Sequence, residues 1–516
     1  MNGAGQPSLP AAPSSELADS AEPAPSRWRA PAAVVDANGI HLGGEVLPLP
    51  EPCTHAGHIA ALVSRLRLGW GGDKRTYPDA GQLWLTAPFL TALGLPTELP
   101  KRIADEKTVL ADALNRPFFT AAAADGWQFG AAARDHLGPW LRAWREQEGA
   151  ALVFVPLVHA SLSALLDDEP SPSALAQRLL RYAETVTIPF RVSAARTSQD
   201  LIKRMDVSRK LVLTEPVEPP PPAAFHLEGD LHWHRAPTEE EARCRYVHAY
   251  DTPAMYLPVA AHAKLGLGAA EYRESPQFDP KMPGYWLARV PAWDDRMLPD
   301  PWRTRDSPRT DGARWLTTPT LGLGLELFDL HPSEIEIAEA YVWPTSTTYL
   351  QKWGKTIDTA RLSFLRQAQE GDSEAGLLVD SVKELYKAGV GLFRSKYIEG
   401  DLYYRPDWQH HIIAGARANL IRKMVKVVAA TGRHPLAVDV DNVLYASDDP
   451  NPVTACPEPL EFGFELGRVK HGGSGYMTDF APLLERRTPF GFGRLATDWD
   501  SGAGAPKDKV NDAAAS

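Results

Sequence analysis

Cysteine is scarce in this chain. The sequence contains three cysteines, Cys53, Cys244 and Cys456, which are far apart and form no CxxC pair. An odd number of dispersed cysteines encodes neither a disulfide framework nor a zinc knuckle. The cysteine usage therefore fits a reducing, cytoplasmic environment.

Long apolar runs are also missing. No run of about 18 apolar residues occurs anywhere in the chain, as a membrane-spanning helix would need. The first 30 residues contain Pro, Ala, Ser and acidic residues but no apolar core of a secretory signal. We therefore expect neither a membrane span nor export by a signal peptide.

The chain has no excess of positive charge. Its 54 Lys and Arg residues against 65 Asp and Glu residues give a formal net charge of -11 at pH 7. This balance excludes a uniformly basic nucleic-acid coat but leaves local basic grooves open. Hydrophobic residues make up 44% and charged residues 23% of the 516 residues, which is typical of folded globular proteins. The length predicts more than one domain.

Proline-rich and small-residue segments mark the predicted domain boundaries. The N-terminal residues lack hydrophobic periodicity, and the last residues read the same way, which predicts disordered tails. The segment EPVEPPPPAAF, with four consecutive prolines, favours a stiff spacer. The predicted order is a tail (1–29), a first domain (30–213), a linker (214–225), a second domain (226–498) and a tail (499–516).

The first domain alternates strand and helix patterns. AAVVDANGIHL predicts a hairpin that turns at Asn38-Gly39, a strong turn signal between apolar runs. Strand-like and helical segments then alternate up to about residue 186, which predicts an α/β or α+β module.

The second domain contains two predicted helices, one at 374–392 and a longer one with a basic face. Apolar residues recur at three- and four-residue spacing from about 408 to 431, with Asp407 as the expected N-cap and Gly432 as the stop. The opposite face carries Arg417, Arg422, Lys423 and Lys426. Such a face is explained either by solvation of a surface helix or by contact with nucleic acid.

Aromatic residues and further cations lie just before that helix. Tyr403 and Trp408 follow Arg394 and Lys396 in the chain. Aromatic rings beside cations are what a single-strand groove uses to stack bases and neutralise phosphates. These residues and the basic face are therefore candidates for a DNA-binding surface, and a solvated helix face remains the alternative at this point.

Three aspartates suggest a metal site. HPLAVDVDNVLYAS predicts a hairpin turning at Asp441-Asn442, with Asp439 and Asp441 on one face and Val440 in the core. Asp251 ends a predicted strand that runs from Tyr246 to Tyr250. Taken singly these are ordinary turn or cap residues, but together they match the way two-metal enzymes hold Mg²⁺ for phosphoryl transfer.

These segments resemble the palm and fingers motifs of family B DNA polymerases. Residues 251–257, DTPAMYL, are similar to D-x-x-S-L-Y-P; residues 383–391, KELYKAGVG, to K-x-x-x-N-x-x-Y-G; and residues 437–442, AVDVDN, to Y-G-D-T-D-S. Departures from the three motifs include Ala254, Leu257, Lys387, Val390 and Asn442.

The polymerase resemblance implies a role for each matching residue. Asp251, Asp439 and Asp441 would be catalytic metal ligands, and Lys383 would contact the incoming triphosphate. Tyr256 would floor the sugar pocket, with Lys387 and Gly391 completing a nucleotide-binding set. VVDANGI resembles the first strand of a ribonuclease H-like exonuclease fold without its D-x-E motif, so the implied first domain is exonuclease-like but without editing activity.

A broader resemblance covers residues 226–480. The order and spacing of many segments are similar to the actinobacterial telomere-associated proteins of the Tap type. The segments include YVHAYDTPAMYL, FDPKMPGYWLARV, RWLTTPTLGLGLEL, EAYVWPTSTTYLQKW, VKELYKAGVGLFRS and GRHPLAVDVDNVLYASDDPNP. The family usually carries a helix-turn-helix region, which we do not find before residue 226.

Two functions follow from these resemblances. The Tap-type resemblance implies a bacterial protein that binds single-stranded 3′ ends of linear replicons and recruits the terminal protein for end replication. The alternative is a Mg²⁺-dependent family B-like DNA polymerase, protein-primed or end-filling. Whether the protein is an enzyme stays open at this point. The expected fold is an N-terminal α/β lobe followed by a polymerase-like palm and fingers lobe of α+β type.

Overall fold

A computed structural model describes residues 28–485 except 72–78, 103–104, 132–139, 159–163, 192, 210–212, 214, 304–308 and 311. The predicted C-terminal tail and nearly all of the N-terminal one lie outside the described residues. The described chain is a mixed α+β architecture, as the sequence predicts. Among its helices, none combines the length and apolar character that crossing a bilayer requires.

The N-terminal lobe is built on one mixed sheet with the strand order β3-β2-β1-β5-β8-β7-β6, and β4 pairs with β5. Its central strands β1, β5 and β8 run parallel, and the outer strands are antiparallel. The strands are β1 (Ala32–Asp36), β2 (Gly39–Leu42), β3 (Glu45–Leu47), β4 (Gly69–Trp70), β5 (Asp79–Leu85), β6 (Gln128–Ala131), β7 (Trp140–Arg145) and β8 (Glu148–Phe154). The first hairpin is confirmed, but Asp36 pairs with Gly39, so its turn is one residue earlier than predicted.

Both faces of this sheet are covered. Side chains alternate along a strand, so Trp84 packs on one face while Leu83 and Leu85 pack on the other. The second face is covered by short helices, and the first by α6. The helices of this lobe are α1 (Ala56–Ala60), α2 (Leu62–Arg65), α3 (Ala87–Ala92), α4 (Glu106–Leu114), α5 (Pro117–Thr120), the 3-10 helix η2 (Ala121–Asp125) and α6 (Pro172–Val186).

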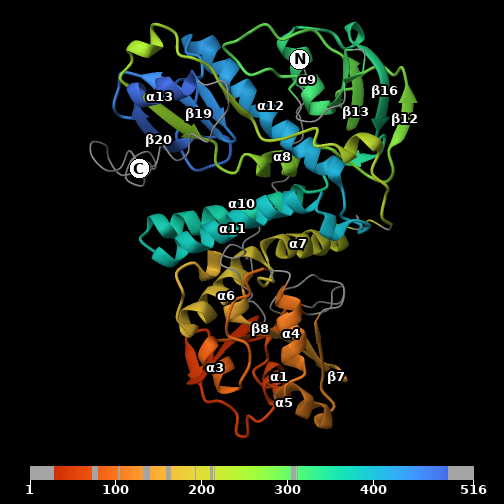
Figure 1. Ribbon diagram of the computed structural model, residues 1–516, viewed down its shortest axis with the longest axis vertical. Helices are drawn as coiled ribbons and strands as arrows, with labels where there is room; N and C mark the ends of the chain where they lie inside the picture. Colours follow the sequence, from red (N-terminus) through yellow and green to blue (C-terminus); the bar gives the residue numbers. More distant parts are fainter. Residues whose placement is uncertain are drawn as a thin grey trace, which may run out of the picture.

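A layer of long helices separates the N-terminal lobe from the rest of the molecule, as Figure 1 shows. It consists of α7 (Ala194–Arg209), α10 (Gln351–Gln369) and α11 (Ser373–Leu392). The helix predicted at 374–392 is confirmed by α11. Arg178 of α6 is buried and bonds to both Asp168 and Glu374, which fastens the N-terminal lobe to α11.

The C-terminal lobe contains two antiparallel five-stranded sheets with α12 running between them (Figure 1). The first sheet has the order β20-β10-β19-β18-β9 and the second β12-β16-β13-β15-β14. The strands are β9 (His232–His234), β10 (Tyr246–Asp251), β12 (Glu271–Glu274), β13 (Gly284–Arg289), β14 (Arg309–Thr310), β15 (Ala313–Thr317), β16 (Glu336–Val342), β18 (Ala437–Asp439), β19 (Asn442–Ser447) and β20 (Lys470–Tyr476); β11 (Leu265–Gly266) pairs with β17 (Ser346–Thr347). The helices are α8 (Tyr256–His262), α9 (Thr318–Leu327), α12 (Pro406–Thr431) and α13 (Met477–Leu484).

The acidic hairpin forms, but its turn differs from the prediction. Asp439 pairs with Asn442, so the turn residues are Val440 and Asp441 rather than Asp441 and Asn442. Val440 has a φ of 60°, a left-handed conformation that is unusual for a β-branched residue. Because of the turn, Asp439 and Asp441 do not lie on one strand face, and Val440 is half-buried rather than in the core.

The long helix predicted at about 408–431 is confirmed by α12, which ends at Gly432 with a φ of 71°. Its start differs from the prediction. Asp407 lies in the first turn and is not the N-cap; Arg405 occupies that position without a side-chain cap bond. Asp407 instead bonds to Arg405 at 2.9 and 2.6 Å, and both residues are buried.

Candidate functional site

A pocket of about 140 Å³ lies between the end of the first C-terminal sheet and the helices α10 and α11. Five residues expected from the sequence line it together, although they come from widely separated parts of the chain: Asp251, Tyr256, Lys383, Lys387 and Asp441. The other lining residues are Pro253, Ala254, Met255, Arg361, Leu365, Val379, Asp380, Tyr386, Phe464 and Lys470. The pocket is therefore where most of the motif residues meet.

Backbone pairing positions the two carboxylates of the pocket. Asp251 is the last residue of β10, where it pairs with Asn442 on one side and Lys470 on the other. The next amide, Thr252 N–H, donates to the carbonyl of Asp441 at 2.9 Å. This bond holds the hairpin turn over the end of β10, so Asp441 lines the same pocket as Asp251.

The two carboxylates influence each other. Burial, and then the negative charge of Asp251, raise the pKa of Asp441 to about 6, while Lys387 and Lys470 act in the opposite direction. The Lys470 ammonium lies 3.7 Å from Asp251 Oδ2. At neutral pH the pocket therefore holds two repelling charges that a nearby cation stabilises.

Helix α11 supplies the facing side of the pocket. Lys383 and Lys387 are four residues apart and therefore lie on one helix face, with Tyr386 and Asp380 beside them. Arg361 of α10 is buried and donates to the Phe464 carbonyl at 2.9 Å. The lining includes four cationic residues, Arg361, Lys383, Lys387 and Lys470, and three acidic ones, Asp251, Asp380 and Asp441. An anion such as a phosphate fits this balance, particularly when a metal ion covers the carboxylates.

Tyr256 lies at the pocket with its hydroxyl engaged. The hydroxyl donates to Asp230, and burial followed by this bond raises the pKa of Tyr256 well above its usual value. The side chain is therefore a neutral, oriented wall of the pocket.

Asp439 does not line the pocket with the other two aspartates. Its Oδ1 lies 2.8 Å from His232 Nδ1 on β9, and it is not among the residues that line the pocket. Across the described part of the chain, the one trio of His, Cys, Asp or Glu ligand atoms within 4.8 Å of one another is formed by His55, His58 and Asp125. The expected convergence of three aspartates is thus replaced by a pair, Asp251 and Asp441.

A carboxylate pair still suits one kind of metal ion. Mg²⁺ is commonly held by one or two carboxylates, with substrate phosphates and water completing its coordination, rather than by an all-protein cage. Asp251 and Asp441 face a pocket that also carries lysines for the phosphates. The donor set therefore fits Mg²⁺ bound together with a phosphate ligand.

The aromatic residues expected to stack on bases lie in the core. Tyr403 is 4% and Trp408 1% exposed. The Trp408 indole donates to the Gly266 carbonyl at 2.9 Å, and its ring packs on Tyr349. A buried ring offers no face to a base, so the stacking role expected for Tyr403 and Trp408 does not fit this structure. Both aromatic side chains pack in the protein interior and do not line a surface groove.

The basic face of α12 is largely neutralised within the protein. Arg417 is buried and bonds to Glu228 and, at 2.9 Å, to Thr320. Arg422 pairs with Glu326 at 2.7 Å. These guanidinium groups fasten α12 to its neighbours, which differs from the expected DNA-facing role.

The other residues that the sequence predicts to bind DNA or nucleotide differ in how exposed they are to solvent. Burial lowers the pKa of Lys423, whereas Lys426 and Lys396 are exposed. Arg394 bonds to His226 and, at 3.2 Å, to the Ala224 carbonyl. Gly391 is exposed on α11 and does not line the pocket.

Four ionisable residues of the pocket are not indicated by the sequence motifs. Asp380 and Tyr386 lie three residues before and after Lys383, so the helical period could have indicated them. Lys470 and Arg361 belong to β20 and α10, and no local pattern marks either of them. Only the pairing of β20 with β10 and the packing of α10 bring them to the site.

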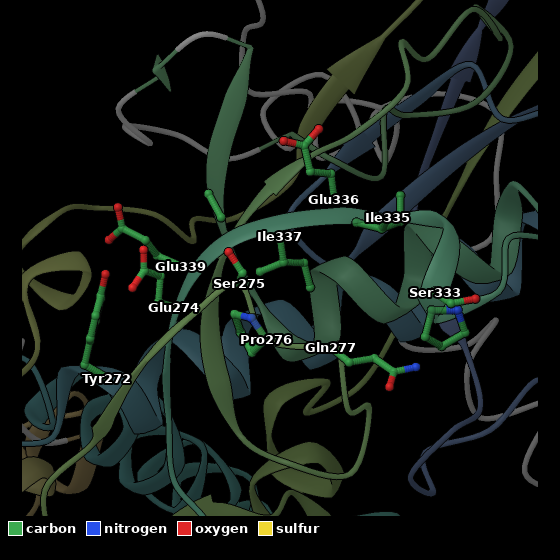
Figure 2. Close-up of a pocket in the computed structure, with 12 residues that line it drawn as sticks. Tyr272, Glu274, Ser275, Pro276, Gln277, Ser333, Ile335, Glu336, Ile337 and Glu339 are labelled. Atoms are coloured by element: carbon green, nitrogen blue, oxygen red, sulfur yellow. The ribbon is translucent and has the colours of Figure 1, made fainter.

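A larger pocket of about 660 Å³ lies over β12 and β16 and has the opposite chemistry. Figure 2 shows Glu274 and Glu339 extending toward the same side as Tyr272, with Glu336 farther along the groove. Glu274 and Glu339 are directly paired across the two strands, and like charges there repel each other. This acidic groove does not suit a phosphate, so we assign the candidate site to the smaller pocket.

The chain matches one family model over part of its length and is similar to solved polymerase structures at low identity. Residues 33–192 match a domain of unknown function, DUF8841. No curated protein matches the sequence. Structures of phi29 DNA polymerase are similar at low identity: an orthorhombic crystal form (11% identity, TM-score 0.44, 76% of each chain) and a ternary complex with primer-template DNA and incoming nucleotide substrates (11%, 0.43, 76% of each chain). A complex with single-stranded DNA is similar at 11% identity and a TM-score of 0.42, over 76% of this chain and 75% of that one.

Proposed function

We propose that this protein binds the single-stranded 3′ end of a linear replicon and recruits the terminal protein for replication of that end. The observation that carries the proposal is the pocket in which Lys383, Lys387 and Lys470 accompany the carboxylates of Asp251 and Asp441. Ammonium groups in a confined pocket attract phosphate, and the Tap-type sequence resemblance supports a DNA end as its source. The cytoplasmic, bacterial location belongs to the same proposal.

The parts of the molecule have separate roles in this proposal. The first C-terminal sheet acts as a polymerase-like palm, α10 and α11 act as fingers, and the N-terminal lobe is a degenerate exonuclease-like unit. The pocket lysines hold the last phosphates of the strand, and exposed Lys396 and Lys426 supply further contacts to its backbone. Asp251 and Asp441 hold a Mg²⁺ ion between the protein and the phosphate. Asp439 supports the hairpin through His232.

DNA binding is tested with a labelled G/C-rich 3′ overhang in a fluorescence anisotropy titration at several salt concentrations. We expect affinity that falls with salt and weakens at least several-fold in Lys383→Ala plus Lys387→Ala, because two phosphate contacts are lost. The exposed Lys281→Ala is the matched control. Equal affinity for unrelated oligonucleotides, or no change in the double variant, would refute the proposal. A pull-down of the terminal protein after nuclease treatment tests the second part of the proposal.

A second function is favoured by the electrostatic coupling of two carboxylates: the negative charge of Asp251 helps to raise the pKa of Asp441. A module that only binds DNA has no need for two carboxylates in a phosphate pocket, whereas a Mg²⁺-dependent family B-like polymerase does. The bound ion would supply charge stabilisation for transfer of a nucleotide. Lys383 and Lys387 would bind the incoming triphosphate, and Tyr256 would limit the space beside the sugar.

The hairpin provides a matched pair of variants that separates the two functions. Primer extension and deoxynucleotidylation of the terminal protein are measured with Mg²⁺ or Mn²⁺ for the parent, Asp441→Asn and Asp439→Asn. Incorporation that Asp441→Asn abolishes while DNA binding persists would establish a polymerase. If the parent incorporates no nucleotide but still binds the overhang, the polymerase function is refuted and DNA binding is the function that remains. Equal incorporation by the parent and Asp441→Asn would reveal a contaminating polymerase.

A further inference from the structure

The N-terminal lobe contains a cluster of metal-ligating side chains far from the pocket described above. His55 precedes α1 as its N-cap, His58 lies within α1, and Asp125 ends η2. One ligand atom from each lies within 4.8 Å of the other two. We propose that His55, His58 and Asp125 form a binding site for a Zn²⁺-class transition-metal ion.

The arrangement of the two imidazoles supports this assignment. The rings of His55 and His58 are stacked, with centroids 3.8 Å apart and an interplanar angle of 26°. His55 Nε2 lies 3.0 Å from Asp125 Oδ2. Two rings this close repel if both are protonated, whereas neutral rings beside a carboxylate are what Zn²⁺ takes as ligands.

The separations fit an ion after a small adjustment. Zn–N and Zn–O bonds are about 2.0–2.2 Å, so two ligands of one ion lie at most about 4 Å apart. The three ligand atoms lie within 4.8 Å of one another, so at most a short movement brings them to one ion, and the Asp125 side chain, which is 50% exposed, has room to rotate. The histidines define the fixed part of the site.

The surroundings of the histidines hold them in place. A side chain at Gly57 would place its Cβ 2.6 Å from Trp127 and 3.0 Å from His55 Nδ1. Glycine is therefore the residue that fits between the Trp127 and His55 rings. Trp127 itself is 3% exposed and carries Arg145 over its ring. The cluster therefore has a rigid, apolar side and an open side where water would complete the coordination.

Metal binding requires a change of tautomer. The amides of Gly57 and Thr54 donate to Nδ1 of His55 and His58 at 3.2 and 3.3 Å, which places the proton of each neutral ring on Nε2. When Nε2 of each ring binds the ion, the proton moves to Nδ1, and these two long backbone contacts are given up. No proton is gained or lost by the neutral rings in this step.

The type of ligand selects the class of ion. Imidazole nitrogen suits Zn²⁺, Ni²⁺ and Cu²⁺, whereas Mg²⁺ and Ca²⁺ prefer oxygen ligands. The two sites of the molecule therefore differ in preference, with Mg²⁺ at Asp251 and Asp441 and a Zn²⁺-class ion here. A bound ion would tie α1 to η2 and so stabilise the N-terminal lobe.

The site is tested on the untagged full-length protein by titration with Zn²⁺ and by the absorption spectrum of bound Co²⁺. The variants are His58→Gln and Asp125→Asn, because His55 also caps α1; His262→Gln, an exposed histidine elsewhere, is the control. We expect one tightly bound ion and a Zn²⁺-dependent rise in melting temperature for the parent and the control.

Loss of one ligand should weaken binding by at least about tenfold in each of the two variants. Binding that is equal in all four proteins would show adventitious coordination and refute the site. The absence of any saturable Zn²⁺ binding by the parent would also refute it. Neither result bears on DNA binding, which is measured at the other lobe.

Discussion

Replacing Asp441 by asparagine removes a negative charge that lowers the stability of the folded protein at neutral pH. The pKa of this carboxyl is about 6 in the folded protein against 3.8 for an ordinary aspartate, a difference of about two units. Each unit corresponds to about 1.4 kcal/mol. Because the raised pKa is shared with Asp251 and the asparagine amide must still be accommodated, we expect Asp441→Asn to raise the free energy of unfolding by about 1–2 kcal/mol at pH 7.

The pH dependence has a definite sign. Between pH 3.8 and about 6 the folded protein binds more protons at Asp441 than the unfolded chain, so the stability of the parent falls as pH rises through this window. Asp441→Asn has no carboxyl group at this position, so it does not lose stability in this way. Its advantage over the parent should therefore be full above about pH 6 and should vanish near pH 4.

The assay is urea denaturation of parent and variant at a series of pH values without divalent cations. Asp439→Asn is the matched control, because it lies on the same hairpin but bonds to His232 outside the pocket. Mg²⁺ should stabilise the parent and leave Asp441→Asn unchanged. A variant that is no more stable than the parent at pH 7, or an equal gain in Asp439→Asn, would refute the electrostatic account of the pocket.

Four further substitutions test how the C-terminal lobe is held together, and each is measured by urea denaturation. Glu228→Gln should cost about 3–5 kcal/mol, because it leaves the buried Arg417 without its charged partner, whereas Arg422→Gln on the same helix should cost less than about 1 kcal/mol at its exposed pair. Equal costs would contradict the burial argument. Trp408→Ala should lower the free energy of unfolding by about 3–5 kcal/mol, because it truncates a core side chain. A near-neutral result would contradict the burial of this ring. Val440→Gly should be stabilising by up to about 1 kcal/mol, since glycine adopts a φ of 60° without strain; a loss of stability would show that the Val440 side chain outweighs the backbone.

Local sequence patterns predicted the elements that carry the site. The strand predicted from Tyr246 to Tyr250 is confirmed by β10, which includes Asp251 as its last residue. Both predicted long helices are confirmed within a few residues. The reason is that hydrophobic periodicity and end signals such as Gly432 act within a few residues of chain. The acidic hairpin was also recognised, but its turn was displaced by one residue, because Val440 adopts a conformation that its residue type disfavours.

Partners across the fold were not predictable in the same way. The sequence shows Arg417, Tyr403 and Trp408 as a basic and aromatic surface, yet Glu228 lies nearly 200 positions away from Arg417 and neutralises it. Charge and aromaticity identify the residue type but not the side of the protein that it faces. Burial is decided by packing among elements, so it cannot be read from one helix.

The sequence by itself indicated four of the seven charged residues of the pocket, Asp251, Asp441, Lys383 and Lys387, because they fall within the segments that resemble the polymerase motifs. Only the tertiary structure decided that Asp439 pairs with His232 and that Lys470 faces Asp251. It also brought His55 and His58 to Asp125. The physical reason is that motifs act over a few bonds, whereas ion pairs and ligand clusters depend on distances in space, which strand pairing and helix packing set across the whole chain.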